Sequence, residues 1–163
     1  MTLNLFDNLT EVEIRREELG PGATILRKFA LLHEAALLSA LDEIVSAAPF
    51  RRMITPGGFR MSVAMTNCGP LGWVTDRSGY RYQTLDPESD RNWPRMPGAF
   101  LSLAIGAATE AGFKDFLPDA CLINRYVQAI VAPGQRRRGL WPTYRLCIAW
   151  NSCHLLIRWS EEG

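Results

Sequence analysis

The strongest constraint on the fold is a change of hydrophobic period along the chain. Apolar residues recur every three or four positions over residues 31–48, which predicts a helix that ends at Pro49. A second stripe of small and apolar residues, over 97–111, predicts another helix, with Pro97 near its start and Gly112 just past its end. The segments around these helices alternate with a period of two, so we expect an α+β fold.

Five segments are predicted to be extended. Residues 23–29 suit a short strand, and residues 59–66 alternate so that Phe59 and Met65 share one face. A small antiparallel unit rich in aromatic residues follows, around Trp73 and residues 80–82. Residues 120–126 form the last strand, in which Leu122, Asn124 and Tyr126 lie opposite Cys121, Ile123 and Arg125.

The sequence Thr55-Pro-Gly-Gly58 predicts a tight turn. Proline presets φ at the second position and glycine accepts a positive φ at the third, which is the type II pattern. We therefore expect the left-handed residue to be Gly57.

Composition limits the classes of function. The 163 residues are 47% hydrophobic and 21% charged, which is enough for one domain with a core. The net charge is +1, so nucleic-acid binding would need a local basic patch. We expect no membrane-spanning segment, no secretory signal, a cytoplasmic location and four cysteines that stay free thiols.

Several strings, taken together and in order, resemble the AlkB family of iron(II)/2-oxoglutarate dioxygenases. The resemblance covers about residues 20–126. Its strings are Ser46–Arg51, Thr55–Gly58, Met61–Gly69, Leu71–Trp73, Gly79–Tyr82, Trp93-Pro94, Met96-Pro97 and Asp119–Tyr126. A single one of these strings would be weak; the ordered set is specific.

The resemblance implies a nucleotide-recognition lid over about residues 50–85, on which an extruded base stacks. Trp73 matches the stacking tryptophan, and Tyr80, Arg81 and Tyr82 match the segment beside the flipped nucleotide. The residues that match the substrate side of the lid are Thr55, Phe59, Met61 and Met65. By periodicity alone, the same pattern is typical of an amphipathic hairpin whose methionines and aromatic rings pack on a core.

The resemblance also implies Fe(II) and 2-oxoglutarate as cofactors. Asn124 and Tyr126, with Arg125 between them, match the family's 2-oxoglutarate-binding strand. Without the resemblance, they would be ordinary polar strand residues. In the family, iron is held by a His-x-Asp pair and a distal histidine, which leave open coordination positions.

The iron ligands are missing where the family has them. Residues 127–139 contain neither His nor Asp, and the only histidines are His33, expected on the surface of the first helix, and His154. Codons can be chosen for residues 130–150 so that a one-base shift reads Ser-Leu-His-Gln-Asp-Lys-Asp-Glu, which resembles the family's iron-ligand strand. We therefore expect residues 127–163 to be an out-of-frame tail.

This interpretation sets the expected domain organisation and fold. A polar N-terminal arm (1–22) precedes the first part of a dioxygenase domain (23–126), and the tail (127–163) follows. The family fold is a double-stranded β-helix, or jelly roll, which we expect to be largely missing. Residues 120–126 would then be an unpaired edge strand, both helices would lack a packing partner, and the fragment would be prone to aggregation.

Three functions compete. By family, the chain descends from an oxidative demethylase of bases such as 1-methyladenine and 3-methylcytosine in single-stranded DNA or RNA, usually monomeric, but without iron ligands it would be inactive. Alternatively, it is a non-catalytic nucleic-acid binder that uses the lid and the basic run Arg136–Arg138. The third possibility is a product without function. A metal site at Cys147, Cys153 and His154 lacks the usual second close pair of ligands.

Overall fold

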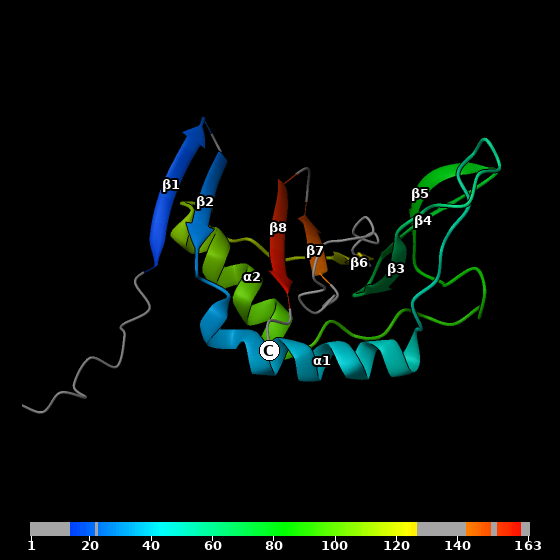
Figure 1. The fold of residues 1–163 in the computed structure, drawn as a ribbon, viewed down its shortest axis with the longest axis horizontal. Coiled ribbons are helices and arrows are strands. Elements are labelled where there is room, and N and C mark those ends of the chain that lie inside the picture. The colour runs from blue at the N-terminus through cyan, green and yellow to red at the C-terminus, as the bar shows by residue number, and fades with distance from the viewer. Residues whose placement is uncertain (1–13, 22, 127–142, 151–152, 161–163) are drawn as a thin grey trace, which may run out of the picture.

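The computed structural model describes residues 14–21, 23–126, 143–150 and 153–160 (Figure 1). The elements follow in the order β1 (Arg15–Gly20), β2 (Ala23–Arg27), the 3-10 turn η1 (Leu31–His33), α1 (Glu34–Ala47), β3 (Ala64–Cys68), β4 (Gly72–Asp76), β5 (Gly79–Gln83), α2 (Gly98–Glu110), β6 (Ala120–Tyr126), β7 (Thr143–Trp150) and β8 (Cys153–Ser160). The α+β expectation is confirmed; the jelly roll stays a prediction. Neither described helix is long and apolar enough to cross a bilayer.

The central sheet is antiparallel, in the order β3-β6-β7-β8. Strand β6 pairs with β3 on one side, where Cys68 lies opposite Cys121, and with β7 on the other. The expectation that residues 120–126 would be an unpaired edge is therefore wrong. The sequence predicts a strand that overlaps β3, but a register between strands distant in sequence leaves no local signal, so the pairings of β6 with β3 and β7 are not predicted.

The two helices cover one face of this sheet. The buried face of α1 (Leu37, Ala40, Leu41 and Ile44) meets the Phe100, Leu103, Ala104 and Ala108 stripe of α2 in one apolar cluster. Cys68, Cys121 and Ile123 of the sheet belong to the same cluster, and β8 lies next to α2. The expectation of helices without a packing partner is thus also wrong. The packing partner is the face of the sheet to which Cys121 and Ile123 of β6 contribute, the face that the alternation predicted for residues 120–126 gives them.

Both helices end close to where the sequence predicts. Pro97 is the N-cap of α2, and Gly112 follows it with φ +91°. The first turn of the helix predicted over 31–48 is instead η1, where His33 is exposed as expected. The C-terminus of α1 is tied to the sheet, because the buried Thr66 hydroxyl donates to the carbonyl of Ala48 at 2.7 Å.

The segment before β3 differs from its prediction. The strand expected over 59–66 begins only at Ala64, because residues 53–61 fold back on themselves with Met61 N–H donating to Met53 O at 2.9 Å. The turn at its tip has the predicted bond, from Gly58 N–H to Thr55 O at 2.8 Å, but the positive φ (+83°) is at Gly58, not Gly57. The type II assignment is therefore wrong.

Two further hairpins lie at opposite ends of α1 in Figure 1. The β1–β2 hairpin takes in the last residues of the predicted arm, and Arg16 donates to the carbonyl of Glu110 at the end of α2, at 2.8 Å. The β4–β5 hairpin, predicted from its aromatic alternation, rests on a second apolar cluster formed by Ala48, Met53, Met65, Val74 and Trp93. This second cluster connects the hairpin to the sheet.

Candidate nucleic-acid interface

The β4–β5 hairpin carries three aromatic side chains on one side, of which Tyr80 and Tyr82 are exposed and Trp73 is half-buried. Trp73 lies opposite Tyr82 and Thr75 lies opposite Tyr80, so all four side chains share one side of the hairpin. The rings of Trp73 and Tyr80 stack with centroids 5.7 Å apart and an interplanar angle of 25°. Tyr80 is 60% exposed and Tyr82 49% exposed. We call Trp73, Tyr80 and Tyr82 the aromatic face; it offers flat, accessible π-surface.

Arg81 lies on the other side of the hairpin. Its guanidinium contacts both carboxylate oxygens of Asp76, Nη2 to Oδ2 at 2.6 Å and Nη1 to Oδ1 at 2.9 Å, and Nε donates to Gln83 Oε1. The hydrogen bond from Arg81, with that from the Ser78 N–H, lowers the pKa of Asp76 to about 2. The structure therefore separates Arg81 from the two tyrosines with which the sequence grouped it.

A buried asparagine attaches the aromatic face to the sheet. The Asn67 carboxamide on β3 donates from Nδ2 to the Trp73 carbonyl at 3.0 Å and accepts the Trp73 N–H at 2.9 Å. Asn67 is fully buried. No role is predicted for Asn67 from the sequence, although a polar residue in the middle of a strand buried on both sides is a signal.

A second anchor, also missed, lies at the base of the hairpin. The buried Trp93 indole donates from Nε1 to the Gln83 carbonyl of β5 at 3.1 Å. Its ring fills the place that a side chain at Gly72 of β4 would occupy. Trp93 therefore contacts both strands of the pair Gly72–Gln83, and Arg51 stacks its guanidinium 5.2 Å from the Trp93 ring centroid.

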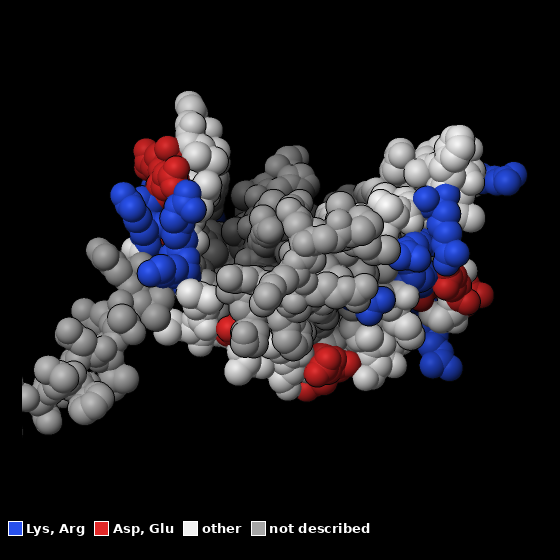
Figure 2. Space-filling view, in the orientation of Figure 1, with Lys and Arg blue, Asp and Glu red and all other residues white. Residues whose placement is uncertain are grey.

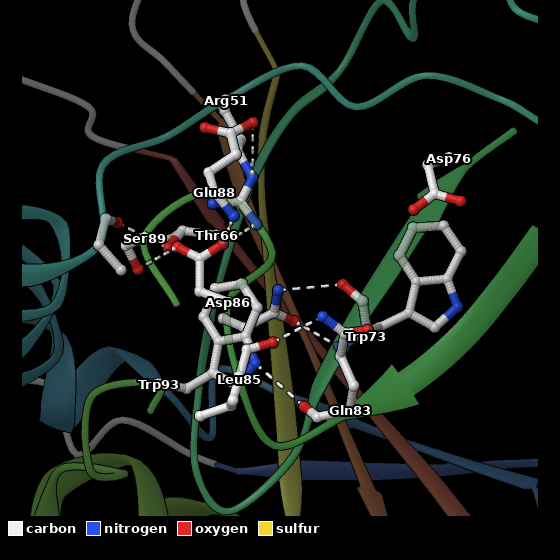
Figure 3. A network of polar contacts seen from close by, with 12 residues as sticks. Arg51, Thr66, Trp73, Asp76, Gln83, Leu85, Asp86, Glu88, Ser89 and Trp93 are labelled. Atoms are coloured by element: carbon white, nitrogen blue, oxygen red, sulfur yellow. Dashed lines mark hydrogen bonds and ion pairs between the residues drawn. The ribbon is translucent and has the colours of Figure 1, made fainter. Parts of the chain in front are cut away.

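An ion pair fixes the loop that follows the hairpin (Figure 3). Arg51 Nη2 lies 2.6 Å from Asp86 Oδ1, and both side chains are largely buried. Asp86 also accepts the Glu88 N–H and the Ser89 hydroxyl. Burial alone would raise the pKa of Asp86, but the bonds from Arg51 and Glu88 N–H outweigh it, so the pKa lies below its usual value.

The four remaining lid residues differ in their exposure. Met65 is only 2% exposed and belongs to the second apolar cluster, and Met61 packs against the same cluster. Thr55 is half-buried, and its Oγ1 accepts the Phe59 N–H at 3.2 Å. Phe59 is largely exposed, so it does not share a buried face with Met65. Met65 thus fits a core role.

Strand β6 separates the predicted 2-oxoglutarate residues. Asn124 is buried and lies opposite Met65, on the sheet face that carries the hairpin, and alternation places Tyr126 on the same face. Arg125 lies on the opposite face, with its guanidinium 4.6 Å from the Phe50 ring centroid. The amide and the phenol can donate hydrogen bonds to a carboxylate together, whereas Arg125 points away from them.

The described residues do not fit the iron site of the family. No group of three His, Cys, Asp or Glu side chains in this part of the chain comes together to hold a metal ion. His33 is exposed on η1, and His154 lies on β8, whose side chains are outside the description. Cys68 and Cys121 are buried, and neither belongs to a disulfide. Arg136–Arg138 lies outside the described residues.

Comparison with known proteins defines the class. Residues 22–132 match the 2OG-Fe(II) oxygenase superfamily, and the chain belongs to it. Within that superfamily the similarity is to AlkB, which confirms the family indicated by the ordered strings. The chain is 49% identical over 132 residues to the alpha-ketoglutarate-dependent dioxygenase AlkB of Escherichia coli K12, covering 81% of this chain and 59% of the relative.

Two further relatives agree. The AlkB of Salmonella typhimurium is 52% identical over 121 residues, or 74% of this chain and 54% of the relative. An AlkB homolog of Caulobacter vibrioides is 44% identical over 93 residues, or 57% of this chain and 40% of the relative. This chain therefore spans a little more than half the length of the first two relatives. Intact members of the superfamily use Fe(II) and 2-oxoglutarate.

Proposed function

We propose that this chain binds an alkylated base of single-stranded nucleic acid on the aromatic face and does not oxidise it. The observation that supports this most is the stack of the half-buried Trp73 on the exposed Tyr80, held from behind by Asn67 and Trp93. An anchored, half-buried indole beside an exposed phenol ring suits stacking with another flat ring. Base–aromatic stacking contributes about 1–3 kcal/mol per base.

The chemistry of the lesion favours an alkylated base over an ordinary one. Methylation at N1 of adenine or N3 of cytosine gives a base that carries a positive charge at neutral pH. A cation over the face of an indole or phenol gains a further electrostatic attraction, about 0.5–2 kcal/mol. Stacking on Trp73 and Tyr80 would therefore discriminate 1-methyladenine and 3-methylcytosine from unmodified bases.

Arginines near the aromatic face suit the phosphates of the strand. Residues 50–95 contain seven arginines, no lysine and four acidic residues, a net charge of +3 in a chain whose total is +1. Asp76 is paired with Arg81, and Asp86 and Glu88 with Arg51. Arg52, Arg60 and Arg77 are exposed, and basic side chains gather at the β4–β5 end in Figure 2.

The proposed lack of catalysis rests on the residues that the family needs for iron. The sequence has only His33 and His154, and neither belongs to a His-x-Asp pair. We propose that residues 127–163 are read out of frame, and that Asn124 and Tyr126 retain only part of the 2-oxoglutarate contacts. The nucleotide sequence of the gene tests this: the shifted frame should encode the His-x-Asp strand, and a frame without it would refute the proposal.

The binding test uses fluorescence anisotropy with a labelled single-stranded oligonucleotide that carries one 1-methyladenine. We expect saturable binding, weaker binding to the unmodified strand, and about a tenfold or greater loss on Trp73→Ala. In parallel, no succinate should form from 2-oxoglutarate when Fe(II) and the methylated strand are added. Unchanged affinity in Trp73→Ala would refute the proposed site, and iron-dependent succinate formation would refute the proposed inactivity.

A further inference from the structure

Asn67 stands out among the buried polar residues of the sheet. It lies in β3 between Thr66 and Cys68, is fully buried, and shares its sheet face with Met65, Leu122 and Asn124. Both ends of its carboxamide are used in one contact, with the main chain of Trp73. A buried carboxamide satisfied by a single residue of the β4–β5 hairpin specifies where that residue must lie.

The geometry of this contact imitates strand pairing. The N–H and C=O of a strand residue point to the same side of the strand, so Trp73 turns both groups toward Asn67 and away from β5. Trp73 and Tyr82 therefore form a pair without mutual main-chain hydrogen bonds, in which side chains approach more closely. In these two hydrogen bonds the Asn67 carboxamide replaces the peptide group of a neighbouring strand.

We infer that Asn67 is a positioning residue for the aromatic face: its carboxamide fixes the backbone of Trp73, and thereby the ring on which a base stacks. The inference rests on the proposed function, since it assigns Asn67 an effect on ligand affinity without contact to the ligand. A residue that served the core alone would affect the stability of the chain and leave the affinity of the folded chain unchanged.

The chain offers a matched control one residue away. Thr66 is equally buried in β3, and its hydroxyl donates to the Ala48 carbonyl, on the helix side of the sheet. Thr66→Val and Asn67→Leu each replace a buried polar side chain with an apolar one of similar size. Both remove buried hydrogen bonds from the same strand, but only Asn67→Leu releases Trp73.

The experiment compares the unaltered chain with both variants. The probe is the single-stranded oligonucleotide with one 1-methyladenine, and far-ultraviolet circular dichroism identifies conditions in which each chain is folded. We expect Asn67→Leu to weaken binding about tenfold, and Thr66→Val to change it less than about twofold. Equal affinities of the two variants would overturn the inference.

A second measurement needs neither a variant nor a ligand. In the unaltered chain, the Trp73 amide should exchange its hydrogen as slowly as the paired amides of β3, because Asn67 accepts it. Exchange at the rate of an unprotected amide would overturn the inference even if Asn67→Leu does not fold. If the unaltered chain does not bind the probe, that result counts against the proposed function. The hydrogen-exchange rate of the Trp73 amide then tests whether Asn67 holds the backbone.

Discussion

Substituting Gly72 by alanine tests how the aromatic face is attached. A Cβ at Gly72 would lie 2.8 Å from Trp93 Cδ1 and closer still to the Nε1 and Cε2 atoms, so the indole must move. Trp93 is buried, and its Nε1–H is bonded to Gln83 O, so movement both overpacks the second apolar cluster and breaks that hydrogen bond. Overpacking costs about 1–3 kcal/mol and the bond about 1 kcal/mol, so we expect a loss of about 2–4 kcal/mol.

The assay is urea unfolding followed by far-ultraviolet circular dichroism, with the free energy of unfolding taken from the midpoint and slope. Gly98→Ala is the matched control, because a Cβ there meets nothing within 4 Å and Gly98 begins α2. Alanine in place of glycine in a helix stabilises by up to about 1 kcal/mol. Equal midpoints for Gly72→Ala and the unaltered chain would refute the packing of Trp93 against β4.

Three further predictions concern the predicted lid, residues 50–85. The Asp76 carboxylate should titrate near pH 2 in a ¹³C NMR experiment. Because its pKa is lowered, its stabilising pairing with Arg81 is complete above about pH 4 and is lost as the pH falls through 2. A titration midpoint near the ordinary 3.8 would contradict the ion pair. Tyr80→Ala should weaken probe binding by about 1–3 kcal/mol while Tyr80→Phe retains it, since stacking and not the hydroxyl is used, and equal losses in both would argue against stacking. Arg60→Gln and Arg77→Gln should each reduce the slope of log affinity against log salt by about 0.7, and an unchanged slope in both would show that neither meets a phosphate.

The sequence predicts the regular elements well where one face is buried. The helices and β6 follow from periodicity, and the Trp73–Tyr82 hairpin from its aromatic alternation. The strand predicted over residues 59–63 is absent because the alternation there belongs to a chain reversal. That reversal packs Met53 and Met61 into the second apolar cluster. The partners of β6 depend on a register between distant segments, which no local pattern encodes.

In the candidate site, too, local alternation predicts some features, and others depend on tertiary contacts. Alternation correctly places Asn124 and Arg125 on different faces of β6. It also places Arg81 on the other side of the hairpin from Tyr80 and Tyr82, as the structure shows. The grouping of Arg81 with the tyrosines came from the family strings alone. The roles of Asn67 and Trp93 depend on tertiary contacts across the second cluster. The predicted instability of the fragment stays a prediction, although its two stated causes, an unpaired β6 and unpartnered helices, are not present.

The most direct test of the central claim is one anisotropy titration of the 1-methyladenine oligonucleotide, run with and without Fe(II) and 2-oxoglutarate under anaerobic conditions. If this chain retains base binding and lacks the metal-holding residues, the dissociation constant will be the same in both series. Binding that requires Fe(II), or no saturable binding in either series, would contradict the account.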